Sequence, residues 1–218
     1  MTKIYSSQDN KWYTYEPNKN VVYLIGHGFN GNKEILENLG FKVYMLYLSD
    51  YDKYPDNWQN NKWYTETLCP KNYKNLASLV DNIIMTDFYD LIRYNEGPGI
   101  VITGSRGGQI TLSRFLKYWR GPSICLNGGC IADISITDAP IAMLTGGNDY
   151  FRSKDLDYTI QRFSDWKDRL HIYHNHQDDH SLPSYNEGVV HLINKLLYTS
   201  FDVRLGNDVV TYDQPKKT

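Results

Sequence analysis

Three side chains that can act together in nucleophilic chemistry lie just after predicted strands. Ser105 sits in a run of mostly small residues at 103–108, Asp149 follows Gly-Gly-Asn, and His180 precedes Ser-Leu-Pro. A serine hydroxyl attacks carbonyl groups only when a base takes its proton, and the base needs an acid to orient it. The order serine, aspartate, histidine therefore predicts Ser105 as nucleophile, His180 as base and Asp149 as its partner.

The run at 103–108 reads Thr-Gly-Ser-Arg-Gly-Gly and lies between a predicted strand and a predicted helix. Small residues on both sides of a serine let the chain turn sharply and expose the hydroxyl, as in the Gly-x-Ser-x-Gly pattern, although Thr103 here takes the first glycine's place. Ser105 could instead cap a helix, which is a common role for serine. Asp149 could be an ordinary turn residue, and only its place after a strand favours chemistry.

Acyl chemistry also needs two donors that hold the negative oxygen formed during attack. The backbone N–H of Arg106 follows the nucleophile, and the loop after the first central strand can supply a second donor from Phe29. His27 precedes that donor. We therefore predict Arg106 and Phe29 as the oxyanion donors and His27 as a candidate substrate contact.

The elements that must position these residues alternate along the chain. Short apolar runs predict strands at 21–25, 42–48, 100–103, 123–126, 141–145 and 170–173. Apolar spacing and turn signals predict helices at 32–39, 73–94, 109–118, 153–166 and 185–197. This alternation predicts an α/β class with a mostly parallel central sheet and helices on both faces. Residues 1–20 and 200–214 are predicted to form small hairpins, the second with a turn at 206–207.

Length and composition predict one soluble domain spanning residues 1–218, with a core at about 21–198. A net charge of −2 argues against a basic surface that binds nucleic acid, and no apolar stretch is long enough to span a membrane. Three cysteines without metal-like spacing favour a cytoplasmic protein. The 19 tyrosines, with abundant Asn and Lys, are typical of an AT-rich genome, such as that of a microbe or of a virus whose protein would act in the host cytoplasm.

An irregular, aromatic-rich insertion is predicted at 49–75. It contains Tyr51, Trp58 and Trp63, which are candidate substrate contacts lining a cover or wall for an acyl or sugar-like group. The same rings could simply roof one flank of the core, because large aromatic side chains usually bury most of their area.

Taken together, the His27-Gly28 pair, the Ser105 turn, the glycine-rich Asp149 loop and the His180 loop resemble the α/β-hydrolase superfamily. The similarity is nearest to its small lidless members, such as dienelactone hydrolases and carboxylesterases. The resemblance implies hydrolysis of an ester, thioester or related acyl bond in a small-molecule substrate, without a cofactor. An alternative within the same fold is a catalytically inactive binding protein, because one fold hosts many functions.

Two further alternatives come from other motifs. Residues 174–180 resemble the His-x-His-x-Asp-His motif of metallo-β-lactamase-like hydrolases, but with one residue too many and no further matching His set. Residues 26–31 read Gly-x-Gly-x-x-Gly, and Asp50 follows at the spacing of a dinucleotide site. The helix predicted after that motif is short, and a dinucleotide reading leaves the Ser-Asp-His order unexplained. We expect no metal; Cys130 lacks a partner histidine and is predicted to be a small packing residue.

Overall fold

The structure of the chain is a computed structural model. It describes residues 2–6, 10–26, 30–47, 88, 90–105, 118–127, 140–149, 160, 170–198 and 208–212. The predicted aromatic insertion at 49–75 lies outside these residues. Most of each helix predicted at 73–94, 109–118 and 153–166 lies outside them as well.

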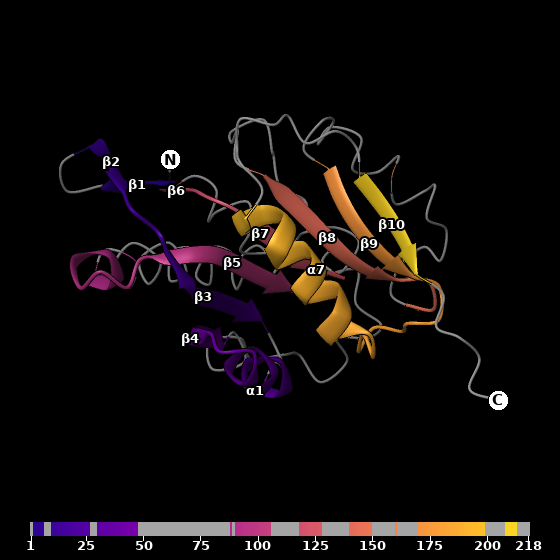
Figure 1. The fold of residues 1–218 in the computed structure, drawn as a ribbon. Coiled ribbons are helices and arrows are strands. Elements are labelled where there is room, and N and C mark those ends of the chain that lie inside the picture. Colours follow the sequence, from indigo (N-terminus) through magenta and orange to yellow (C-terminus); the bar gives the residue numbers. More distant parts are fainter. Residues whose placement is uncertain are drawn as a thin grey trace, which may run out of the picture.

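Seven strands form the central sheet, in the order β10-β9-β8-β7-β5-β3-β4 (Figure 1). Every neighbouring pair is parallel. The strands are β3 (Asn18–Gly26), β4 (Lys42–Tyr47), β5 (Pro98–Gly104), β7 (Ser123–Leu126), β8 (Ile141–Gly146), β9 (Leu170–Asn175) and β10 (Asp208–Tyr212). This arrangement confirms the predicted α/β class with a parallel sheet.

The middle of the sheet consists of strands that are buried from end to end. Every residue of β5, β7 and β8 is buried. Continuous apolar runs of this kind form where both faces of a parallel strand are covered, so no polar alternation is needed. β7 has the predicted bounds, whereas β5 begins two residues early, at Pro98, a strand-initial position that proline tolerates.

Alternate side chains of the sheet enter two different apolar clusters. On one face, α1 (Asn30–Asn38) and α7 (Tyr185–Tyr198) pack against residues such as Leu24 and Ile102 (Figure 1). On the other face, Tyr23 and Val101 pack with Phe88 and Trp119. No helix in the described part of the chain is long and apolar enough to cross a bilayer.

A small antiparallel sheet lies beside the central one, in the order β2-β1-β6 (Figure 1). Its strands are β1 (Thr2–Ser6), β2 (Lys11–Tyr15) and β6 (Trp119–Arg120). The Tyr15 hydroxyl accepts a hydrogen bond from Trp119 Nε1 at 2.7 Å and donates one to the Pro98 carbonyl at 2.9 Å, which ties the two sheets together.

The hairpins predicted at the two chain ends have different outcomes. The hairpin predicted within residues 1–20 is confirmed by the antiparallel pairing of β1 with β2. The strand near the C-terminus, β10, instead joins the central sheet parallel to β9. The turn predicted at 206–207 lies outside the described residues.

Gly188 lets α7 lie close to the sheet, and we expect Gly188→Ala to destabilise the protein. A Cβ there would stand 2.1 Å from Leu144 Cδ1 and 2.9 Å from Tyr173 Cδ1, both in buried side chains. Alanine favours a helix by about 1 kcal/mol over glycine, but such overpacking typically costs about 1–3 kcal/mol. Because the Cβ would meet two buried side chains at once, we expect the cost to exceed the gain, so urea unfolding should show a net loss of up to about 2 kcal/mol. The exposed Asn194→Ala on the same helix is the control, and an equally stable Gly188→Ala would contradict the prediction.

Candidate active site

Ser105, Asp149 and His180 come from three separate strand ends and meet at one edge of the sheet. Ser105 directly follows β5, Asp149 follows β8 by three residues, and His180 lies in the loop between β9 and α7. The carboxyl ends of parallel strands share one edge, and ligands of open α/β sheets bind there. The chain passes from β3 to β4 on one side and then returns to β5 on the other side of β3. Ser105 therefore lies beside the point where the strand order reverses.

The backbone at Ser105 has the sharp turn that the sequence predicted. Its φ angle is 47°, in the left-handed region that residues with a side chain rarely adopt. Its backbone N–H donates to the Leu126 carbonyl at the end of β7, at 2.8 Å. Such strained turns persist where the surrounding structure fixes them, and here the turn leaves the serine side chain partly exposed.

Thr103 departs from the usual glycine two residues before the serine, and the structure accommodates it. Its side chain is buried, and its hydroxyl lies 3.5 Å from the Ile124 carbonyl of the neighbouring strand. Thr103 is thus an ordinary internal residue of β5, so the turn at Ser105 forms with threonine in this place.

His180 bridges the other two side chains. Its Nδ1 lies 2.9 Å from Asp149 Oδ2, and its Nε2 lies 2.9 Å from Ser105 Oγ. A carboxylate can only accept hydrogen bonds, so the contact with Asp149 favours the His180 tautomer that carries its proton on Nδ1. That tautomer leaves the Nε2 lone pair to accept from the serine hydroxyl. The Asp149 side chain is fully buried, whereas that of His180 is 25 % exposed, so the acid is shielded while the base can be reached.

Two glycines allow the Asp149 loop and the His180 loop to touch. A Cβ on Gly146 would stand 2.4 Å from the Asp178 carbonyl oxygen, and one on Gly147 would stand 2.7 Å from that of His176. The loops are joined by bonds from the Gly147 N–H to the Asn175 carbonyl and from the Asn148 N–H to the Asp178 carbonyl, both 2.8 Å. The glycines are therefore a steric requirement of the contact between acid and base.

The remaining predicted site residues lie outside the described part of the chain. These are the oxyanion donors and the candidate substrate contacts: Phe29, Arg106, His27, Tyr51, Trp58 and Trp63. They stay predictions. Asp50, which belongs to the dinucleotide alternative, and Cys130 also lie outside it.

The three histidines of the metal-like motif do not all meet at one place. His174 is buried within β9 and His176 is exposed, with their rings 4.6 Å apart, while His180 contacts Asp149 and Ser105. Among the residues that the structure describes, no three His, Cys, Asp or Glu side chains could jointly hold a metal ion.

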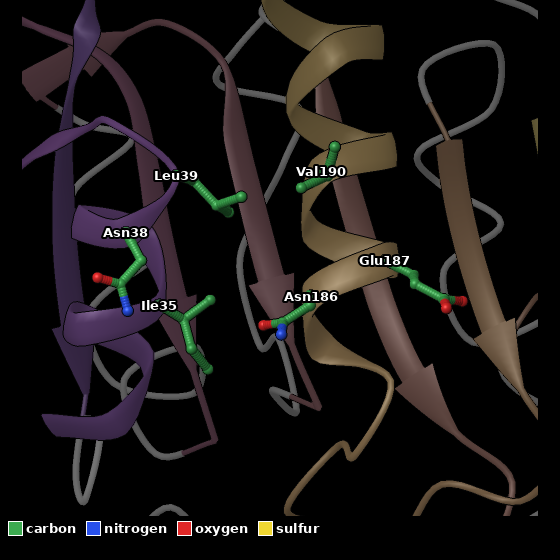
Figure 2. A pocket seen from close by; sticks show the side chains of 6 residues that line it. All are labelled: Ile35, Asn38, Leu39, Asn186, Glu187 and Val190. Atoms are coloured by element: carbon green, nitrogen blue, oxygen red, sulfur yellow. The ribbon is translucent and has the colours of Figure 1, made fainter.

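A surface groove is lined by residues other than Ser105, Asp149 and His180. It runs between α1 and α7 and is lined by Ile35, Asn38, Leu39, Asn186, Glu187 and Val190 (Figure 2). It lies between the two helices that cover one face of the sheet, and its lining includes none of Ser105, Asp149 and His180. We therefore assign it no part in the chemistry of Ser105.

Sequence reasoning missed one buried polar residue that touches this site. Asn127 directly follows β7, and its side chain bonds to the loops that carry Asp149 and His180. Its position as the first residue after a strand was a usable signal, since the same rule picks out Ser105. What it contacts could not be read from the sequence, because its partners are backbone groups distant along the chain.

Asp178 predicts a specific pH dependence of stability. Burial raises the pKa of its carboxyl above the ordinary value of 3.8, and the charges of Asp179 and Glu187 add to this, while hydrogen bonds from Ser184 oppose it. The native state therefore binds this proton more tightly than the unfolded chain does. The contribution of Asp178 to the free energy of unfolding is greatest below pH 3.8 and falls as pH rises through the native pKa.

We expect Asp178→Asn to remove this dependence, because the amide does not titrate. Urea unfolding between about pH 4 and pH 7 should show the variant gaining stability relative to the wild type as pH rises. Asn can still accept a hydrogen bond from the Ser184 N–H, so the start of α7 is retained. A stability difference that is constant with pH, or that moves the other way, would contradict the prediction.

Comparison with known proteins supports the fold. No protein-family model matches the chain, and no curated protein sequence matches it. A solved structure from Xanthomonas campestris pv. campestris, described as a hydrolase of the alpha/beta superfamily, matches with a TM-score of 0.52 at 15% identity, over 82% of this chain and 98% of that one. The esterase domain of a Rhodothermus marinus protein matches with a TM-score of 0.51 at 11% identity, over 88% and 95%.

An uncharacterized protein from Bacillus cereus ATCC 10987 matches with a TM-score of 0.56 at 12% identity, over 86% of this chain and 63% of that one. Identities this low establish shared architecture rather than shared activity. The parallel sheet and these likenesses agree with the predicted fold. The chain has an α/β-hydrolase-like fold.

Proposed function

We propose that the protein is a serine hydrolase that cleaves an ester, thioester or related acyl bond through an acyl-serine intermediate. The observation that carries the proposal is the continuous chain of hydrogen bonds from Ser105 Oγ through His180 to Asp149, both links 2.9 Å long. The strained turn at Ser105 adds support, because a nucleophile of this type sits on such a turn. The likeness to hydrolase and esterase structures supports the reaction class.

In the proposed first half-reaction, His180 Nε2 takes the proton from Ser105 Oγ as that oxygen attacks the acyl carbon. The carbonyl π electrons move to oxygen, which the N–H groups of Phe29 and Arg106 would hold. When the tetrahedral species collapses, the bond to the leaving group breaks and His180 gives it the proton. Asp149 keeps Nδ1 protonated and stabilises the imidazolium formed between these steps.

In the second half-reaction, water attacks the acyl-serine while His180 takes one of its protons. Collapse breaks the bond to Ser105 Oγ, the proton returns to that oxygen, and the acid product leaves. Ser105, His180 and Asp149 all return to their starting protonation states, so the proposed reaction needs neither a cofactor nor a metal. His27, Tyr51, Trp58 and Trp63 remain candidate contacts for the acyl substrate.

The test is intact-mass analysis after exposure to a fluorophosphonate, which phosphonylates an activated serine and releases fluoride. We expect one adduct on the folded protein, mapped by peptide fragmentation to Ser105, and none on protein unfolded in urea. Addition of a chelator should leave the adduct unchanged. A folded protein that forms no adduct would overturn the proposal and favour a binding protein of the same fold.

A further inference from the structure

Asn127 lies where the loops after three strands meet. Its side chain is buried, with 2 % of its surface exposed. Its Nδ2 donates to the carbonyl oxygens of Asp179, at 3.2 Å, and His180, at 3.4 Å, while its Oδ1 accepts from the Gly146 N–H at 3.1 Å. The amide nitrogen and the amide oxygen are thus both engaged, as a buried polar group requires.

The backbone around Asn127 adds a second link. Its φ angle is 39°, a left-handed conformation that asparagine tolerates better than most residues. Its N–H donates to the Leu144 carbonyl at 2.9 Å, and the preceding carbonyl, of Leu126, accepts from the Ser105 N–H at 2.8 Å. The end of β7 therefore holds the backbone of Ser105 on one side and, through the Asn127 amide, the backbone of His180 on the other.

The position of the His180 backbone decides whether its ring can serve both partners. The ring must keep 2.9 Å contacts to Asp149 and Ser105 at opposite nitrogens, with only two side-chain torsions available. A displacement of about 1 Å in such a constellation can cost roughly 10²-fold in rate. From this geometry, and resting on the proposed function, we infer that Asn127 is a positioning residue that holds His180 between Asp149 and Ser105.

A neighbouring asparagine distinguishes positioning from simple loop attachment. The Asn148 Nδ2 also links the same two loops, by a 3.1 Å bond to the Gln177 carbonyl, but this side chain is exposed. The backbone bonds from Gly147 and Asn148 to the β9 loop do not involve the Asn127 amide. Removing that amide should therefore leave the loops joined while freeing the end that carries His180.

Two variants isolate the amide of Asn127. Asn127→Gly keeps the left-handed backbone without strain and deletes all three hydrogen bonds. Asn127→Asp keeps an acceptor for the Gly146 N–H but loses the donors, and it turns a carboxylate toward two carbonyl oxygens. Asn148→Ala is the matched control, because it deletes an exposed amide from the same loop pair.

We would measure the rate of adduct formation with a fluorophosphonate and the downfield proton signal of His180 Nδ1–H by NMR. We expect Asn127→Gly and Asn127→Asp to react roughly 10²-fold more slowly, with the signal shifted or lost. Asn148→Ala should keep the signal and stay within about twofold of the wild-type rate. A circular dichroism spectrum like that of the wild type would show that the fold is retained.

Wild-type rates and an unchanged proton signal in both Asn127 variants would overturn the inference while leaving the proposed function intact. Failure of both variants to fold would also overturn it, because Asn127 would then serve folding rather than positioning. An unreactive wild type would overturn the proposed function itself. The wild-type measurement thus separates the two failures.

Discussion

Replacing Ser105 with alanine is expected to abolish turnover, with kcat falling by roughly 10⁶-fold. The hydroxyl that attacks the substrate is gone, and His180 has no proton to take from it. Because the Ser105 side chain is only partly buried, the fold should survive. The measurement is hydrolysis of activated esters and thioesters by the purified variant, together with the loss of the fluorophosphonate adduct.

Two further variants sharpen this test. Ser105→Gly should be equally inactive but more stable than Ser105→Ala by about 1 kcal/mol, because only glycine adopts a φ of 47° without strain. Ser181→Ala removes a serine beside His180 whose hydroxyl is bonded to Asp179 at 2.5 Å, and it should remain active. Turnover near the wild-type level in Ser105→Ala would show that another group is the nucleophile.

The central sheet could be predicted because its strands are encoded locally. The buried runs of β5, β7 and β8 are continuous and apolar, so their pattern appears in any short window. Strand β6 was not predicted because two residues are too few to show a periodic pattern of apolar side chains. It is defined only by its pairing with β1, more than a hundred residues away. The same reasoning applies to β10, whose parallel partner β9 cannot be inferred from its own residues.

The site shows the same division between local and long-range information. The rule that ligands bind at strand ends, combined with the order of residue types, placed Ser105, Asp149 and His180 at one edge, and the distances agree. The role of Asn127 depends on carbonyl oxygens that carry no residue-specific signal. The requirement for Gly146 and Gly147 follows from a contact between two loops, so it too becomes visible only in three dimensions.

Changing Asp149 to asparagine is expected to lower kcat by about 10⁴-fold while the fold is retained. An amide facing Nδ1 of His180 can present an N–H, which favours the imidazole tautomer with its proton on Nε2. That nitrogen can then no longer accept from Ser105 Oγ. The variant also loses the negative charge that stabilises the imidazolium. Steady-state kinetics should show the loss in kcat rather than in KM, since Asp149 is fully buried and has no surface for substrate.

Asp178→Asn is the matched control for this prediction, because it makes the same chemical change at another buried carboxylate nearby. The Asp178 carboxylate accepts hydrogen bonds from Ser184, directly before α7, rather than from the His180 ring. Its kcat should therefore remain within a few-fold of the wild type. Equal losses in the two variants would mean that the loops merely lose their shape when a carboxylate is neutralised. Only a loss specific to Asp149→Asn assigns Asp149 to the proton chemistry of His180, because the Asp149 carboxylate faces the imidazole and the Asp178 carboxylate faces Ser184 instead.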